Sequence, residues 1–375
     1  MLKKQKCYLC GNEKLSEMLG SVRDNNQLTI LTCDACSLVF LSSFNHINDN
    51  LYGDAKMHDN DMGDGRALGI DELVNITAED DNRRFNQFKT ILTGKKLLDF
   101  GCGIAGVIKK ARDISIVADG IELERRLFTY YKENKLNVYR DLTEIRKKIY
   151  DVITVFHVLE HIADPRVLLE DMKSNLKNDG QIIIEIPNVE DALLTLYNCK
   201  PFSHFYYWSP HLFYYSAKTL EKLAFQTGFK INYIEQYQRY PLSNHLYWLA
   251  FGKPGGHELL KTFNDVDLNL VYSKKLASMG KCDTIIRKDI MQDSEFDLIL
   301  DEILLGGDLA IAKNDPQRNI YFTRISMDGL NEMHAYSTDK RLYEYLEYEA
   351  FELVSDAKDY LKKLIRLEDD SLNHA

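Results

Sequence analysis

The stretch LLDFGCGIAGVIKKA, residues 97–111, decides the fold of this chain. The residues before its first glycine form a short apolar run that predicts a strand, and those after its last glycine predict the start of a helix. Between them Gly101, Gly103 and Gly106 form a Gly-x-Gly-x-x-Gly turn. In a strand–turn–helix unit such glycines give a tight turn, a close approach of backbone to ligand, and a close contact of helix with sheet. We therefore expect this turn to hold a small molecule at the start of the helix.

Two acidic residues distinguish among the cofactors that fit such a turn, which are NAD, FAD and S-adenosylmethionine. Asp99 lies two residues before the first glycine, where a carboxylate would repel a pyrophosphate but attract the ammonium group of a methionine moiety. Glu122 ends the next apolar run about 20 residues on, where an acid can accept hydrogen bonds from a ribose diol. Together these residues favour an S-adenosylmethionine site over the alternative interpretation, an ordinary tight turn followed by a surface acid.

At this point the chain resembles the class I S-adenosylmethionine-dependent methyltransferases over about residues 85–250. The stretches YDVITVFHVLEHIADPRVLLEDM and DGQIIIEIPN resemble their fourth and fifth strands. PHLFYYSAKTLEKLAFQTGFKI resembles the loop, helix and strand that follow in members acting on small molecules. The resemblance implies an α/β, Rossmann-like sheet. Within its pattern Asp99, Gly101 and Gly103 match the methionine-binding loop, Glu122 the ribose acid, and Asp141 with Leu142 the stretch that flanks adenine.

Composition limits the class of protein. With 375 residues the chain is long enough for two or three domains, and its 45% hydrophobic and 28% charged residues are ordinary for a globular protein. A net charge of −10 argues against a broad phosphate-binding face and makes nucleic acid a poor partner. The sequence has no run of eighteen apolar residues, and MLKKQKCYLCG lacks the apolar core of a signal peptide. We therefore expect a cytoplasmic location and no membrane insertion.

Four of the seven cysteines form two Cys-x-x-Cys knuckles near the N-terminus. The pairs are separated by a segment that reads as a turn-rich hairpin, and four thiolates can close a tetrahedral zinc site. Four ligands leave no open coordination position, so we expect a structural zinc ion that folds a segment too small for its own core. The predicted ligands are Cys7, Cys10, Cys33 and Cys36.

A zinc module ahead of a methyltransferase domain has two precedents, in ribosomal RNA methyltransferases and in bacterial nucleotide-sugar methyltransferases. Residues 1–45 mix basic and acidic side chains and form no basic stripe for a phosphate backbone. The run FHVLEH stands where enzymes that methylate nucleobase amino groups commonly carry an Asn/Asp-Pro-Pro-aromatic loop. We therefore favour a nucleotide-linked or surface-glycan sugar as the acceptor, methylated on oxygen, nitrogen or carbon. An RNA methyltransferase and a catalytically silent S-adenosylmethionine-binding scaffold remain the alternatives.

Methyl transfer to a hydroxyl or carbon acid also needs a base, and open parallel sheets place their sites beyond the carboxyl ends of the strands. Histidines and an acid follow the expected fourth and fifth strands there, although a single histidine is often only a loop residue bonded to backbone. The predicted catalytic residues are His157, Glu160, His161, His204 and His211.

A second aromatic stretch, YQRYPLSNHLYWLAFGKPGGH, spans residues 237–257. Its spacing suits a core helix, but polar groups among aromatic rings also suit a sugar pocket, with an arginine available to a diphosphate. Both interpretations stay open. The predicted substrate-binding residues are Arg239, Asn244, His245 and Trp248.

The predicted domain organisation follows from these segments. Residues 71–93 predict an amphipathic helix leading into the first strand, and Tyr52 is expected to face the cofactor. The last segment reads as strand, helix, loop, helix and resembles the opening of a GNAT acetyltransferase, with a plain helical appendage as the alternative. The expected parts are a zinc module at 1–45, a linker or lid at 46–84, the methyltransferase domain at 85–256, a helical region at 257–315 and a partial GNAT-like segment at 316–375.

Overall fold

The computed structural model divides the chain into two units, residues 1–290 and 291–375. It describes residues 5–54, 68–147, 149–263 and 265–290, and two strands beyond them. These strands, β12 (Leu309–Ala312) and β13 (Asn319–Phe322), pair in antiparallel fashion within the second unit. The rest of the GNAT-like segment predicted at 316–375 lies outside the described residues.

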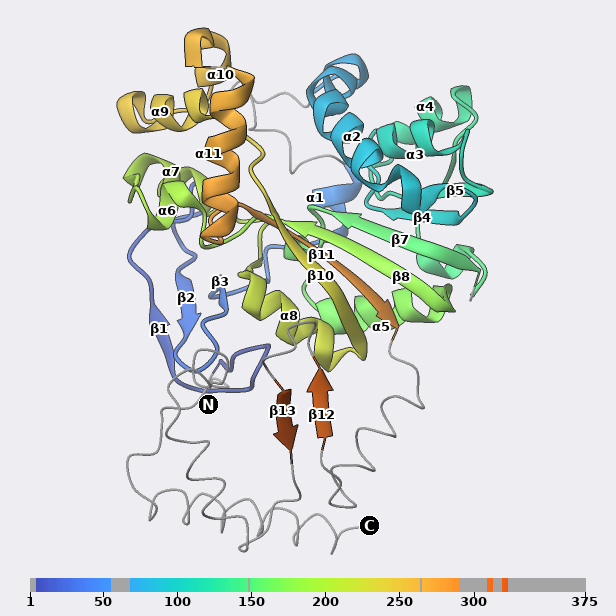
Figure 1. Ribbon diagram of the computed structural model, residues 1–375, viewed down its shortest axis with the longest axis horizontal. Coiled ribbons are helices and arrows are strands. Elements are labelled where there is room, and N and C mark those ends of the chain that lie inside the picture. Colours follow the sequence, from blue (N-terminus) through green and yellow to red (C-terminus); the bar gives the residue numbers. More distant parts are fainter. Residues whose placement is uncertain are drawn as a thin grey trace, which may run out of the picture. The chain divides into compact units, whose positions relative to one another are not determined.

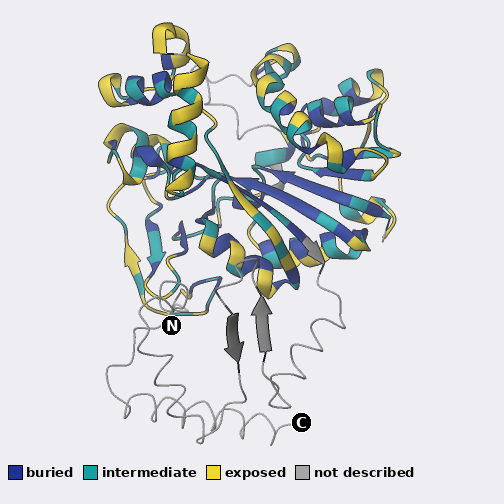
Figure 2. Ribbon diagram, viewed as in Figure 1, coloured by how far each residue is buried: buried dark blue, intermediate teal, exposed yellow. Residues whose placement is uncertain are grey.

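The first unit is built on a seven-stranded sheet with the order β10-β11-β8-β7-β4-β5-β6 (Figure 1). The five strands from β8 to β6 run parallel, and β11 runs antiparallel to both of its neighbours. Burial on both faces explains the apolar runs of the central strands, which are the most deeply buried ribbons in Figure 2. The strands are β4 (Lys96–Phe100), β5 (Val117–Ile121), β6 (Asn137–Tyr139), β7 (Tyr150–Phe156), β8 (Leu176–Ile186), β10 (Phe229–Tyr237) and β11 (Asp283–Ile290). The α/β, Rossmann-like prediction is confirmed.

Strand β11 corrects the predicted helical region at 257–315. Its residues Thr284–Asp289 pair with Ile186–Gln181 of β8, so the strand completes the sheet instead of following it. The predicted end of the methyltransferase domain at residue 256 is therefore too early. The helices between β10 and β11 form an insertion: α9 (Leu242–Phe251), α10 (Gly256–Leu259), η4 (Lys261–Phe263) and α11 (Val266–Ser278).

Helices cover both faces of the sheet (Figure 1). On one face lie α2 (Ile70–Leu92), α3 (Gly106–Ala111) and α4 (Leu127–Glu133), and on the other α5 (Pro165–Asn175) and α8 (Ala217–Gln226). Helix α2 confirms the amphipathic helix predicted at 71–93. Short helices α6 (Ala192–Thr195) and α7 (Lys200–Tyr206) follow β8. Among the described residues no helix is both long and apolar enough to cross a membrane.

The N-terminal segment forms a small second sheet with the order β1-β2-β3-β9. Strands β1 (Leu15–Glu17), β2 (Ile30–Cys33) and β3 (Val39–Leu41) come from this segment, whereas β9 (Phe213–Tyr214) belongs to the loop after α7. Because β3 pairs directly with β9, the N-terminal module is joined to the methyltransferase part by backbone hydrogen bonds. Helix α1 (Asp49–Gly53) follows, and residues 55–67 of the predicted lid lie outside the described part of the chain.

Candidate active site

The glycine turn joins β4 to α3 as predicted. Gly101 and Gly103 have φ values of 71° and 50°, in the left-handed region where a side chain is strained. A Cβ on Gly101 would come within 2.3 Å of Val158, so this glycine allows the loop after β7 to lie against the turn. A Cβ on Gly103 would meet no described atom within 4 Å. Gly103 therefore leaves an open face for a ligand.

Gly106 makes a different contact from the one predicted. A Cβ there would lie 2.0 Å from a carboxylate oxygen of Asp81 in helix α2, so the close approach is to this helix and not to the sheet. The Asp81 side chain also accepts a hydrogen bond from Thr77 at 2.8 Å. A carboxylate at the start of α3 occupies the place where a helix would favour an anion. This arrangement disfavours a pyrophosphate at the turn.

Asp99 is a second acid beneath the turn. It is 4% exposed and accepts a hydrogen bond from the Thr154 hydroxyl at 2.7 Å. Burial raises the pKa of the Asp99 carboxyl to about 7, although the Thr154 hydrogen bond acts in the opposite direction. A cationic ligand group would compensate the ionised carboxylate and reverse that shift. Asp99 is therefore suited to bind the ammonium group of the methionine moiety, as the sequence predicts.

Glu122 follows β5 at the same edge of the sheet. Its carboxylate accepts backbone hydrogen bonds from Gly103 at 2.9 Å, Leu123 at 2.7 Å and Glu124 at 3.0 Å. Burial raises its pKa, and these three N–H groups oppose the shift. The contact with Gly103 fixes the acid beside the open face of the turn, where it can accept from a ribose. Farther along this edge, Asp141 caps the short helix η2 (Leu142–Glu144) by accepting from Thr143 at 2.7 Å.

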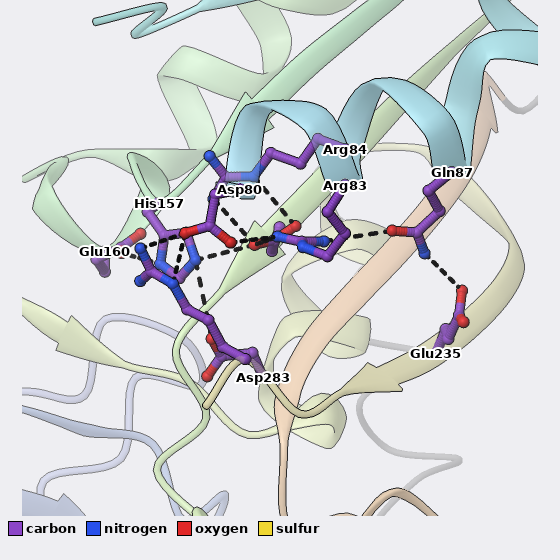
Figure 3. Close-up of polar contacts among 10 residues, drawn as sticks. Asp80, Arg83, Arg84, Gln87, His157, Glu160, Glu235 and Asp283 are labelled. Atoms are coloured by element: carbon purple, nitrogen blue, oxygen red, sulfur yellow. Dashed lines mark hydrogen bonds and ion pairs between the residues drawn. The ribbon is translucent and has the colours of Figure 1, made fainter. Parts of the chain in front are cut away.

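His157 ends β7 in a charged network that Figure 3 shows in close-up. Its φ of 55° is unusual for a residue other than glycine and turns the chain sharply. The ring lies 3.0 Å from Glu185 and 3.6 Å from Glu160. Burial by itself would lower the pKa of His157, but the contacts with these two carboxylates raise it to about 9. His157 is therefore a cation at neutral pH and a poor base, in contrast to its predicted catalytic role.

The carboxylate of Glu185 is the centre of this network. It is fully buried in β8 and accepts hydrogen bonds from Arg83 at 2.7 Å and Arg84 at 2.9 Å, both on helix α2. These residues were missed by the sequence analysis. A lone acid inside the run QIIIEIPN was the available signal, because a buried carboxylate requires cationic partners. The network ties α2 to the carboxyl end of the sheet.

Glu160, His161 and His211 converge beside the glycine turn. Glu160 and His161 lie on η3 (Leu159–His161), directly after Val158, and His211 precedes β9. One ligand atom from each lies within 4.8 Å of the others, and the two imidazole rings are 4.7 Å apart. Trp208 contacts both rings, and the hydroxyl of Tyr52 donates to the His161 carbonyl at 3.3 Å. Three of the predicted catalytic residues are thus brought together.

The charges in this cluster differ from residue to residue. Burial would raise the pKa of Glu160, but the His157 contact and the nearby His161 and His211 lower it to about 2. Burial lowers the pKa of His211 to about 3, and His161 adds to the shift. At neutral pH the cluster therefore combines an ionised carboxylate with a neutral His211 imidazole.

The N-terminal module holds the loop that carries His211. Asp24 accepts hydrogen bonds from the backbone and hydroxyl of Ser209, and the His46 ring contacts the Ser209 carbonyl at 2.7 Å. The guanidinium of Arg23 lies 4.5 Å from the centre of the Trp208 ring. These contacts hold the loop to the N-terminal module, and the Leu212 backbone N–H holds it to η3 by donating to the Glu160 carbonyl.

Two other predicted residues lie elsewhere. His204 is exposed on α7 and its ring contacts Ser21 at 2.9 Å, so it does not join the catalytic cluster. Arg239 donates to the Asp80 carboxylate at 2.7 Å. Its charge is thereby compensated, which weakens its predicted role with a diphosphate.

The predicted substrate residues on α9 are part of the interior. Asn244 accepts from the Gly255 backbone at 3.1 Å, and His245 contacts Gln238 at 3.0 Å and Tyr272 at 2.6 Å. Trp248 is 3% exposed and packs with Leu193 and Cys199. Because these side chains are buried and already engaged, the core-helix interpretation replaces the sugar-pocket interpretation.

The four N-terminal cysteines meet as a group. Their sulfur atoms lie within 4.8 Å of one another, with Cys7 and Cys36 3.5 Å apart and Cys10 and Cys33 3.4 Å apart. Zinc–sulfur bonds of about 2.3 Å in a tetrahedron separate sulfurs by about 3.8 Å. The cluster therefore has the composition and nearly the size of a four-cysteine zinc site.

Parts of the chain match known proteins. Residues 78–234 match the family described as a methyltransferase domain. A ubiquinone biosynthesis O-methyltransferase of Glaesserella parasuis is 32% identical over 114 residues, covering 26% of this chain and 47% of that protein. The same enzyme of Haemophilus ducreyi is 29% identical over 123 residues, covering 28% and 52%. The chain spans about half the length of these curated relatives.

Solved structures also resemble the chain. An S-adenosylmethionine-dependent methyltransferase from Archaeoglobus fulgidus aligns with a TM-score of 0.41 at 20% identity, over 56% of this chain and 93% of that one. The family match covers the glycine turn, Glu122 and η3, the segments that form the site described above. The chain therefore contains a class I S-adenosylmethionine-dependent methyltransferase domain.

Proposed function

We propose that the chain transfers a methyl group from S-adenosylmethionine to a hydroxyl of a small molecule. The observation that carries the proposal is the meeting of Glu160, His161 and His211 beside the glycine turn, through the contact of Val158 with Gly101. The cofactor supplies an electrophilic methyl group on a sulfonium. Asp99 would bind its ammonium group and Glu122 its ribose.

The chain's own residues would position the acceptor and take its proton. His211 is neutral at neutral pH, so its ring nitrogen can accept a hydrogen bond from the acceptor hydroxyl, whereas cationic His157 cannot. Its low pKa makes it a weak base, so it would take the proton late, from the strongly acidic oxonium that forms as the methyl group arrives. His157 instead keeps Glu160 ionised and fixed in place. Tyr52 and Trp208 provide aromatic surface next to His161, which suits a ring-shaped acceptor and excludes water.

The favoured acceptor remains a nucleotide-linked or surface-glycan sugar. The mixed charge of the N-terminal module and the protein's net charge of −10 support a small molecule over RNA. A second candidate is an aromatic hydroxyl, because the curated relatives are named as ubiquinone biosynthesis O-methyltransferases. Structural zinc on the four cysteines and a cytoplasmic location are part of the same proposal.

The experiment is a transfer assay with S-adenosylmethionine carrying a deuterated methyl group. Nucleotide sugars, catechols and an RNA mixture are each incubated with the full chain, and products are detected by mass spectrometry. We expect label on a sugar oxygen. Label on a catechol alone would replace the sugar acceptor with an aromatic one, and label on RNA or on no acceptor would contradict the proposal.

A further inference from the structure

We propose that Glu160, His161 and His211 bind a divalent metal ion, in addition to the zinc on the four cysteines. The three residues come from two segments that are far apart in the sequence, η3 and the loop before β9. Their nearest ligand atoms lie within 4.8 Å of one another. Atoms about 2.1 Å from one ion lie about 3–4 Å apart, so a small contraction of the cluster completes the site.

Glu160 carries the main observation behind this proposal. The residue is 2% exposed, and neither carboxylate oxygen has a hydrogen-bond partner among the described residues. The Nδ1 atom of His157 is 3.6 Å away, too far for a normal hydrogen bond. A buried carboxylate without donors is costly unless a cation compensates it. His157 compensates the charge only from the side of Oε1, so a metal ion at the cluster would bind Oε2.

The histidines have the geometry of metal ligands. Nδ1 of His161 lies 3.0 Å from the Pro210 carbonyl, and because a carbonyl only accepts, this nitrogen carries the proton. A metal ion would bind the other nitrogen, Nε2, in its deprotonated form, and the Pro210 carbonyl fixes the direction of the ring. Nδ1 of His211 is buried and has no hydrogen-bond partner among the described residues. Each ring therefore places a nitrogen within 4.8 Å of a Glu160 carboxylate oxygen.

The ligand set limits the kind of ion and its use. Two imidazoles and one carboxylate suit first-row divalent ions such as Mn²⁺, Fe²⁺, Co²⁺ or Zn²⁺, and three protein ligands leave coordination positions open. Because Val158, the residue before η3, lies against Gly101 of the turn, we expect an acceptor oxygen in an open position to be near the cofactor. An ion there would lower the pKa of the bound hydroxyl and orient it, so that with the ion bound His211 would act as a ligand and no longer as the base. This role rests on the proposed function, but the metal site itself does not.

The test titrates Mn²⁺ into the zinc-loaded full chain without cofactor or acceptor, and follows free Mn²⁺ by electron paramagnetic resonance. Thiolate sites prefer softer ions, so Mn²⁺ reports on the second site. We expect one bound Mn²⁺ per chain. Glu160→Gln and His211→Gln should each weaken binding at least tenfold, while His204→Gln, a histidine outside the cluster, should leave it unchanged.

Calorimetry with S-adenosylmethionine checks that each variant is folded. Should Glu160→Gln fail this check, His211→Gln carries the test alone. Absence of Mn²⁺ binding to the unaltered chain would overturn the metal site, and so would binding that both variants leave intact. Either result would mean that the His157 imidazolium by itself compensates the negative charge of Glu160. Mn²⁺ binding without methyl transfer would instead contradict only the proposed function.

Discussion

The cofactor half and the acceptor half of the candidate site differ in how the chain builds them. The cofactor half comes from one short stretch, Asp99 to Glu122. This stretch runs from β4 through the glycine turn and α3 to the end of the adjacent strand β5. The acceptor half combines η3, the loop before β9 and the N-terminal module that holds this loop. Because the two halves come from different segments, we expect that each can be perturbed without the other. Damage to the module should reach the acceptor side and leave the cofactor side intact.

Removal of zinc should have the largest effect, and this effect should fall on the acceptor half and not on the cofactor half. Structural zinc sites contribute about 10–16 kcal/mol to the folding of small domains, so chelation should unfold residues 5–45. The His211 loop would then lose its contacts with Asp24 and His46, and methyl transfer should nearly disappear. Zinc content, transfer and S-adenosylmethionine binding are measured together, and added zinc should restore activity. Loss of cofactor binding together with zinc would show that the halves are not separable.

The two halves also differ in what the sequence could predict. The strand, the glycines, Asp99 and Glu122 obey fixed local spacings, and the cysteine pairs do so as well. In contrast, β11 is inserted into the sheet after a helical insertion, and strand order is not encoded in a local period. His245 looks the same in sequence whether it lines a pocket or contacts Tyr272 in a core. Its partner is decided by tertiary structure.

Glu185→Gln tests the network that connects α2 to β8 and to His157 at the end of β7. The change leaves Arg83, Arg84 and His157 without their shared carboxylate, and breaking a buried ion pair costs about 3–5 kcal/mol. Denaturant unfolding of the full chain should show a loss of this size. Glu235→Gln is the matched control, because Glu235 is exposed and contacts only the Gln87 amide in this network. Equal stability of the two variants would argue against a structural role for the network.

His211→Asn tests the acceptor half by itself. Loss of the imidazole should lower turnover about 100-fold, because the acceptor proton loses its base or its bound ion. S-adenosylmethionine affinity should stay within a few-fold, since His211 is absent from the glycine turn. The same substitution at His204 should have little effect on turnover. If turnover of His211→Asn stays as high as that of the His204 control, the positioning of acceptor and cofactor is enough for the reaction and no base at His211 is needed.

The smallest expected effect is a pH dependence on the cofactor side. The Asp99 pKa of about 7 means that the carboxyl is protonated at lower pH and cannot pair with an ammonium group. Affinity for S-adenosylmethionine should therefore fall by up to about tenfold per pH unit below 7. Because this pKa is raised on folding, the unliganded protein should also lose stability as the pH rises from about 4 through 7. Calorimetry and thermal unfolding measure both effects, and Asp99→Asn should remove both. An affinity independent of pH in the unaltered chain would place the ammonium elsewhere.

The most direct test of the account is calorimetry of S-adenosylmethionine binding to the unaltered chain and to Gly103→Asp. Gly103 has an open face and a φ of 50°, so an aspartate there fills the approach of the cofactor and adds charge beside Glu122. We predict one binding site per chain and almost complete loss of binding in the variant, with thermal unfolding showing that the variant is still folded. Unchanged affinity in a folded Gly103→Asp chain would contradict the assignment of this turn as the cofactor site.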